Sequence, residues 1–156
     1  MIRYITIGKE TVIPLQPIQV SILSKIATED GDEQTIEQEL EGRFKERDDH
    51  WLLKYTEKPG TSEQVQTTVK AYEKEVTVIR QGEISYRQRY RLEEITTCVV
   101  TTPGGNMDME VNTLDYSREQ TGDGGLIRFT FRLRMGGENM GRYQLSIGWT
   151  EVPEAT

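Results

Sequence analysis

Apolar and polar side chains alternate with a period of two over most of the chain after Pro17. This alternation is typical of antiparallel strands that bury one face and expose the other. It is clearest at 127–135, where Ile, Phe, Phe, Leu and Met alternate with Arg, Thr, Arg and Arg. It also occurs at 18–26, 51–55, 65–71, 76–80, 84–92, 95–99, 107–111 and 143–149. These segments predict an all-β protein.

Short runs rich in glycine, proline, asparagine and aspartate separate the predicted strands. They are Asp30-Gly31, Pro59-Gly60, Gly82, Pro103-Gly104-Gly105-Asn106, Gly122-Asp123-Gly124-Gly125 and Gly136-Gly137-Glu138-Asn139. Glycine and asparagine tolerate the positive φ of tight hairpins, so each strand should pair with its neighbour in sequence. A meander this long leaves two free edges unless it closes on itself. We therefore expect an antiparallel up-and-down β-barrel of about 8–10 strands.

The segment Glu33–Glu46 admits two interpretations. Ile36, Leu40 and Phe44 are spaced by four in a stretch rich in Glu and Gln, which indicates an amphipathic helix. The same residues alternate with glutamates, which indicates a strand whose inward face includes Gln38. A glycine inside the segment disfavours the helix by about 1 kcal/mol relative to alanine. These residues favour the strand but leave both interpretations open.

One domain accounts for the whole sequence, 1–156, with the barrel at 18–152. The mass of 18.0 kDa is typical of a chain that folds around one hydrophobic core. Residues 4–7 suit a short strand, but Pro14 and Pro17 prevent a regular strand from continuing through the residues after it. We expect residues 1–16 to form an N-terminal arm that either caps one end of the barrel or stays loose.

Composition narrows the class of protein. The chain carries a formal net charge of −7 and one cysteine, Cys98, which excludes an internal disulfide. The negative charge makes the surface a poor general attractor of nucleic acids or anionic membranes. No apolar run approaches the roughly 18 residues of a membrane span, and residues 1–10 lack the layout of a signal peptide. We expect a cytoplasmic protein that binds neither nucleic acid nor membrane.

Few residues suit catalysis or metal binding. Nucleophilic catalysis by Cys98 needs a base such as His50 at hydrogen-bond distance, and the predicted strands do not bring the two together. A zinc site needs several Cys and His ligands, and Asp48, Asp49 and His50 lack the ligand count of a calcium loop. We therefore expect His50 to be an exposed turn residue, and we expect no catalytic residues, no metal, no cofactor and no enzymatic activity.

Arginines on two predicted strands face outward, because the opposite faces of these strands are apolar or aromatic. They are Arg87, Arg89 and Arg91 on one strand and Arg128, Arg132 and Arg134 on the other. They form either a solvated exterior with weak ion pairs or a basic stripe that docks an acidic protein or an RNA backbone. The overall negative charge favours the first interpretation.

Arg80 differs, because it comes after Val76 and Val78 in their alternation and should face the barrel interior. An inward charge is costly unless it is paired or reaches water. Other polar side chains expected at interior positions are Gln38, Tyr55, Tyr86, Gln88 and Tyr90. With Arg80 they form a candidate site for a carboxylate or phosphate. The alternative is a structural Arg80, bonded to strand-end carbonyls or to an internal glutamate.

Two short elements, Arg80-x-Gly82 and Thr102-Pro103-x-Gly105, resemble the YwiB-like family of small bacterial proteins of unknown function. The resemblance extends over residues 18–152, and neither element is a catalytic motif. It implies a closed lipocalin-like (calycin-like) β-barrel and favours the strand interpretation of Glu33–Glu46. It implies no particular activity, because a fold does not determine a function.

Two functions are consistent with such a barrel, because small barrels either pack their own side chains or hold one small ligand. We expect a non-enzymatic barrel that binds a small anionic or amphipathic molecule through the interior residues around Arg80. The alternative is a protein-interaction or scaffold barrel with a packed interior. It would act through its outer face, through residues 1–16 or through a homo-oligomeric contact.

Overall fold

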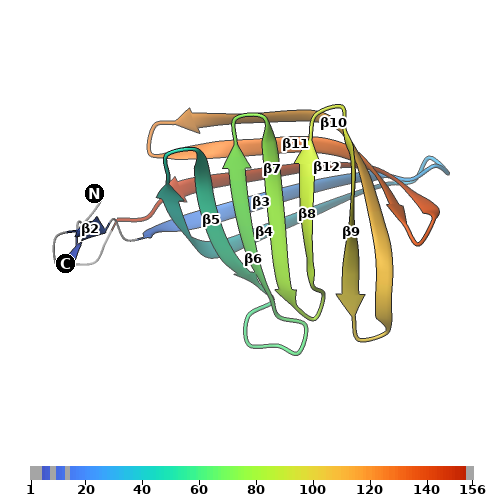
Figure 1. Cartoon of the computed structure of the whole chain (residues 1–156), viewed down its shortest axis with the longest axis horizontal. Helices are drawn as coiled ribbons and strands as arrows, with labels where there is room; N and C mark the ends of the chain where they lie inside the picture. Colours follow the sequence, from blue (N-terminus) through green and yellow to red (C-terminus); the bar gives the residue numbers. More distant parts are fainter. Residues whose placement is uncertain (1–4, 8–9, 13–14, 154–156) are drawn as a thin grey trace.

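The alternating segments form antiparallel strands in the computed structural model, which describes residues 5–7, 10–12 and 15–153. Ten of these strands make one sheet that curls into a nearly closed barrel (Figure 1). The prediction of an all-β up-and-down barrel is therefore confirmed. The described ranges contain no helix that could cross a lipid bilayer.

Each barrel strand coincides with a segment of alternating residues. The strands are β3 (Gln16–Ala27), β4 (Glu33–Glu46), β5 (His50–Glu57), β6 (Val65–Tyr72), β7 (Glu75–Gly82), β8 (Tyr86–Arg91), β9 (Ile95–Thr102), β10 (Gly105–Thr121), β11 (Gly124–Met135) and β12 (Glu138–Glu151). Two short strands, β1 (Ile5–Ile7) and β2 (Glu10–Val12), pair with each other in a separate sheet. The other residues of the predicted arm before residue 15 lie outside the described ranges.

The first and last barrel strands close the barrel by pairing with each other. The β3–β12 ladder runs from Ala27 opposite Arg142 to Ile18 opposite Glu151. Consecutive strands pair elsewhere, so the sheet order runs from β8 back to β3, continues to β12 and ends at β9. The sheet edges β8 and β9 therefore face each other across a seam.

An isolated backbone bridge and a few side-chain hydrogen bonds connect β8 and β9 across the seam. Ser85 and Thr101 form a single bridge at one end. Nearer the other end, the Gln88 Nε2 donates 2.8 Å hydrogen bonds to the Arg89 carbonyl and to the Thr96 Oγ1. The seam thus has fewer backbone hydrogen bonds than an ordinary strand pair would supply.

Glu33–Glu46 is a strand, so the helix interpretation is wrong. Its residues pair with β3 from Phe44 opposite Gln16 to Glu33 opposite Ala27. On its other side β4 pairs with β5 only from Gly42 to Glu46, which leaves the first half of β4 with a free edge. A Cβ at Gly42 would lie 2.8 Å from the Lys54 carbonyl oxygen, so glycine permits this close pairing.

The core is one continuous apolar cluster along the barrel. At its centre the Tyr90 ring lies 4.7 Å from the Phe129 ring and 4.8 Å from the Phe131 ring, measured between centroids. Near one end, Trp149 covers Gly125, where a Cβ would come within 2.4 Å of the Trp149 Cζ2. The predicted inward faces of the strands therefore supply most of the core.

Candidate functional site

The barrel interior contains a partly open cavity of about 290 Å³. Most of its polar wall is built from β4 to β8, with one polar residue each from β3 and β12, and apolar side chains of β3, β7 and β10 to β12 complete the lining. The polar lining residues are Ser24, Gln38, Tyr55, Glu57, Thr67, Arg80, Tyr86, Tyr90 and Tyr143. The apolar ones are Ile22, Val78, Met109, Phe131, Leu133 and Leu145. This volume lies just below the range of about 300–1,000 Å³ that is usual for small-molecule sites.

An ion pair lies in the polar wall of the cavity. The Arg80 Nη2 is 3.0 Å from the Glu57 Oε2, and the two side chains are 24% and 15% exposed. The same carboxylate accepts a 2.8 Å hydrogen bond from the Thr67 hydroxyl and a 3.4 Å hydrogen bond from the Gln38 Nε2. The charge of Arg80 is therefore balanced inside the barrel.

Tyr86 completes the surroundings of Arg80. The guanidinium carbon lies 5.7 Å from the centroid of the Tyr86 ring, within the range of a cation–π contact. Burial acts to lower the pKa of Arg80, but Tyr86 and Glu57 outweigh it and raise that pKa above its ordinary value. Burial raises the pKa of Tyr86 in turn, although Arg80 opposes this. Arg80 thus stays charged and Tyr86 stays neutral at physiological pH.

Two tyrosines place buried side chains against the cavity. Tyr55 is 7% exposed and Tyr90 is 3% exposed. Neither hydroxyl has a hydrogen-bond partner within the described part of the chain. Tyr116 differs, because its hydroxyl donates a hydrogen bond to the Tyr72 carbonyl. Burial raises the pKa of both Tyr55 and Tyr90, so both hydroxyls keep their protons. The fully buried polar atoms without a partner in the described ranges are Gln88 Oε1 and Thr113 Oγ1, so the Tyr55 and Tyr90 hydroxyls instead open onto the cavity, where they can bond to a molecule.

Five of the six predicted site residues line this cavity, namely Gln38, Tyr55, Arg80, Tyr86 and Tyr90. The sixth, Gln88, is fully buried but points to the seam with β9, where it bonds to Thr96. The prediction that it joins the other five is therefore wrong. The alternation of 65–71 placed Thr67 on the inward face without assigning it to the site, and the alternation of 51–55 missed Glu57. Glu57 comes two residues after Tyr55, so extending the pattern of β5 by one step would have found it.

Cys98 and His50 do not form a catalytic pair. Cys98 is half-buried, and burial raises the pKa of its thiol although the Arg87 backbone opposes this. His50 Nδ1 lies 2.7 Å from Asp49 Oδ1, and the His50 ring packs 4.9 Å from the Tyr72 ring. His50 is thus the first residue of β5 and partly covered, which corrects the prediction of an exposed turn residue.

Metal ligands are sparse in the part of the chain that the structure describes. There, no group of three or more His, Cys, Asp or Glu side chains lies close enough together to hold a metal ion. The described residues that surround the cavity supply one carboxylate, that of Glu57.

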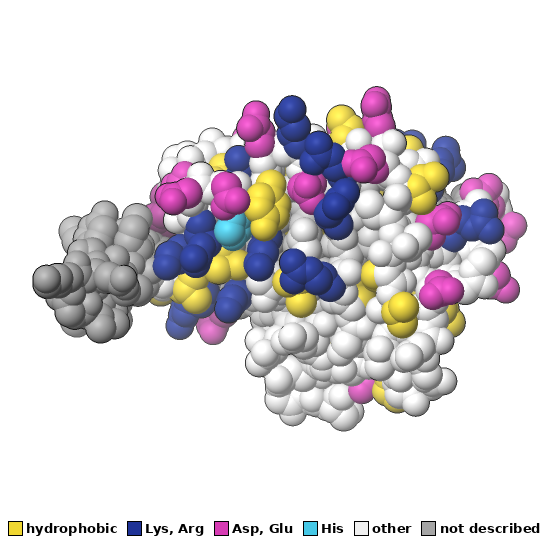
Figure 2. Space-filling model, viewed as in Figure 1, with side chains coloured by type: hydrophobic (Ala, Val, Ile, Leu, Met, Phe, Trp, Pro, Cys, Tyr) yellow, Lys and Arg dark blue, Asp and Glu magenta, His cyan; other side chains and the backbone are white. Residues whose placement is uncertain are grey.

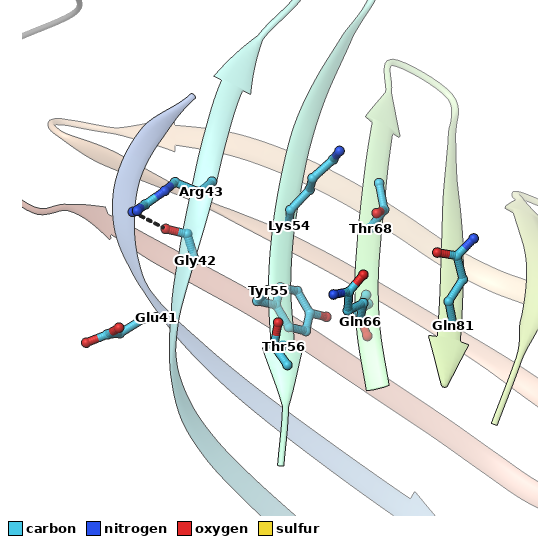
Figure 3. A pocket seen from close by; sticks show the side chains of 10 residues that line it. Glu41, Gly42, Arg43, Lys54, Tyr55, Thr56, Gln66, Thr68 and Gln81 are labelled. Atoms are coloured by element: carbon cyan, nitrogen blue, oxygen red, sulfur yellow. Dashed lines mark hydrogen bonds between the residues drawn. The ribbon is translucent and has the colours of Figure 1, made fainter. Parts of the chain in front are cut away.

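A second hollow, of about 440 Å³, lies on the outer face of the barrel where β4 separates from β5 (Figure 3). Its lining is mainly polar and comprises Glu41, Gly42, Arg43, Lys54, Tyr55, Thr56, Gln66, Thr67, Thr68 and Gln81. Arg43 reaches back to the Gly42 carbonyl, 3.5 Å from its Nη1. This outer groove presents two cationic side chains from neighbouring strands.

Comparisons with known proteins agree with this architecture. Residues 20–147 match a family described as a domain of unknown function (DUF1934). The fold is similar to the crystal structure of the ywiB protein from Bacillus subtilis, with a TM-score of 0.78 and 21% sequence identity. That similarity covers 89% of this chain and 94% of the ywiB chain. No curated protein matches the sequence.

Proposed function

This chain belongs to the DUF1934 family, and we propose that its barrel is a non-enzymatic binding protein for one small, uncharged, amphipathic molecule. The resemblance to the YwiB-like family is thereby confirmed. The observation that carries the proposal is the pair of tyrosine hydroxyls, of Tyr55 and Tyr90, that open onto the cavity without protein partners in the described ranges. A ligand in the cavity would supply those partners.

The ion pair favours an uncharged ligand over the anionic one that we expected from Arg80 alone. Glu57 already neutralises Arg80 at 3.0 Å, so the cavity wall offers no net charge to an anion. The guanidinium still carries N–H groups beyond the one that meets Glu57, because it has five donors. The pair and the tyrosine hydroxyls therefore suit a ligand with both hydrogen-bond donors and acceptors.

The apolar half of the lining supports an amphipathic ligand. Ile22, Val78, Phe131, Leu133 and Leu145 lie across the cavity from the polar wall, or beside it. Apolar walls with a few placed polar groups are the usual composition of a small-molecule site. The scaffold alternative required a fully packed interior. Because the barrel contains a cavity, that alternative is the weaker of the two hypotheses.

We place the proposed function in the cytoplasm because the chain has a single cysteine and no disulfide to protect.

Native mass spectrometry of the protein isolated from its own cells tests this proposal. We expect one co-purifying small molecule, which Tyr55→Phe/Tyr90→Phe loses because the two hydroxyls that hold its polar end are gone. Tyr116→Phe is the matched control, because its hydroxyl bonds to the Tyr72 carbonyl and does not line the cavity. The proposal is wrong if the wild type carries no molecule, or if the control loses it as readily as the double variant.

A further inference from the structure

We propose that the outer face of β4 to β8 binds a short, extended acidic segment of a partner protein. This site is distinct from the cavity, and it consists of six cations that we call the basic patch. They are Arg43, Lys45, Lys54, Lys70, Arg87 and Arg89. Figure 2 looks onto the outer face of this part of the barrel and shows Lys and Arg side chains over β5 to β8, with some Asp and Glu side chains beside them.

The strand register places these cations in two neighbouring rows across the sheet. One row consists of Arg43, Lys54, Thr68, Ile79 and Arg87. The next consists of Lys45, Leu52, Lys70, Thr77 and Arg89. Neither row contains an acidic residue, although the whole chain has a net charge of −7.

The arrangement is unfavourable for the barrel on its own. Arg43 and Lys54 are register partners, and like charges directly opposite each other on one face of a sheet destabilise it. Among the six, only Arg89 forms an ion pair in the described part of the chain, at 3.2 Å from Glu75 and 3.6 Å from Glu94. The cost is explained if a partner supplies the missing negative charge.

Arginines on the opposite side of the barrel differ in that their rows contain acidic residues, although Arg132 and Arg142 are register partners there as well. The row through Arg128 continues across β12 and β3 to Glu37, and the row through Arg132 continues to Glu33. Each of those rows therefore contains its own acidic residue. The absence of acids from the two rows of the basic patch is thus a local feature of β4 to β8.

The outer groove gives the basic patch hydrogen-bonding groups as well as charge. Figure 3 shows Thr56, Gln66, Thr68 and Gln81 beside Lys54 on one face of neighbouring strands. Hydroxyl and amide side chains can both donate to and accept from a peptide backbone. The groove can thus hold an extended peptide while the cations meet its carboxylates.

The size and surroundings of the basic patch favour a short acidic peptide over a nucleic acid. Five strands spaced by about 4.8 Å span about 19 Å, which six extended residues cover at about 3.3 Å each. Glu41 lines one end of the outer groove, and the outer line of β4 continues beyond it as Glu39 and Glu37; these carboxylates repel a long polyanion. Neither row contains an aromatic side chain on which bases could stack.

Fluorescence anisotropy with a labelled octa-glutamate peptide tests the proposal on the full chain at about 50 mM salt, where screening is weak. We expect the wild type to bind, and Arg43→Gln/Lys54→Gln to weaken that binding by about tenfold or more, since two direct charge contacts are lost. Arg128→Gln/Arg132→Gln removes the same charge from the opposite side and should change affinity by less than about twofold. Melting curves of both variants verify that the barrel is folded.

Three results would overturn the proposal. No binding of octa-glutamate by the folded wild type would exclude an acidic-peptide site. An equal loss of affinity in the two double variants would show general electrostatic attraction. Tighter binding of a labelled octa-uridylate than of octa-glutamate would identify the basic patch as a nucleic-acid surface instead.

Discussion

Arg80 and Glu57 face each other inside the barrel, with the guanidinium Nη2 3.0 Å from the carboxylate Oε2. They come from β7 and β5, and the strand between them supplies Thr67, which pairs with Arg80 in register and donates to the same carboxylate. This relationship combines the two roles considered for Arg80. It is a structural arginine with an internal glutamate, and it also lines a cavity.

Removal of either partner should destabilise the barrel. Arg80→Met leaves Glu57 without its counter-ion, and Glu57→Gln leaves Arg80 without its own. We expect each to cost about 1–3 kcal/mol, less than a fully buried pair because both side chains keep some exposure. Urea unfolding of the two single variants and the double variant measures the coupling. Strictly additive losses would mean that the pair contributes no interaction energy of its own.

Glu57→Gln should also change which molecules the barrel retains, because it changes the charge inside the cavity. Glu57→Gln leaves a net positive charge in the cavity, so we expect this variant to retain anionic molecules that the wild type releases. Mass spectrometry after incubation with a mixture of fatty acids and their methyl esters shows whether each protein retains the anionic acids or the uncharged esters. Equal retention of acids and esters by Glu57→Gln would contradict this electrostatic account.

Alkaline pH should unfold the protein through its buried tyrosines. Burial raises the pKa of Tyr55, Tyr86, Tyr90 and Tyr143, and it raises that of Tyr116 to about 12. A pKa that is higher in the folded state gives stability that is complete below pH 10 and is lost as pH rises through the folded value. Unfolding free energy should therefore fall steeply above about pH 10. Tyrosinate absorbance at 295 nm that rose fully near pH 10 in the folded protein would contradict the burial of these hydroxyls.

Gly125→Ala should destabilise the end of the core that Trp149 closes. The new Cβ would lie 2.4 Å from the Trp149 Cζ2 and 3.0 Å from the Glu119 carbonyl oxygen, so the ring must shift. We expect a loss of about 1–3 kcal/mol in a thermal or urea melt. Gly104→Ala is the matched control, because its Cβ would meet nothing closer than 3.7 Å. A melt of Gly125→Ala that matches the control would mean that this contact is not made.

Cys98→Ala should leave ligand retention intact. The thiol is half-buried, and its pKa is raised by burial, so it is a poor nucleophile. We expect a loss of no more than about 1 kcal/mol of stability, from the partly buried apolar surface of the side chain that alanine lacks. Melting curves and native mass spectra measure both properties. Retention that disappears at unchanged stability would implicate the thiol in binding.

Alternation along single strands predicted the inward face of most strands, but it reversed β9, where Ile95 and Val99 are exposed and Val100 is buried. Val76, Val78 and Arg80 face inward together, as do Tyr86 and Tyr90 on the next strand. This happened because period two is a local property of the extended backbone. Glu57 was not predicted because it stands after the last apolar residue of β5, where composition no longer distinguishes strand from loop.

Relationships between strands were harder to predict, because they depend on register and closure. Gln88 faces inward as expected, but its bond to Thr96 exists only because β8 and β9 meet at the seam. A bulge between Thr113 and Asp115 reverses the facing of β10, and this concealed the inward position of Tyr116. The basic patch depends on the register of five strands, and the outward arginines of β8 alone did not reveal it.

The closure of the barrel by β3 and β12 has a consequence for folding speed. That ladder joins the two most distant barrel strands in sequence, whereas the seam between sequence neighbours β8 and β9 contributes a single bridge. A circular permutant that begins with β9, joins β12 to β3 through a short linker and ends with β8 would pair every strand with its sequence neighbour. Folding slows as contacts become more distant in sequence, so this permutant should refold faster than the natural chain in stopped-flow experiments. The natural order of strands thus delays assembly until both ends of the barrel segment have met.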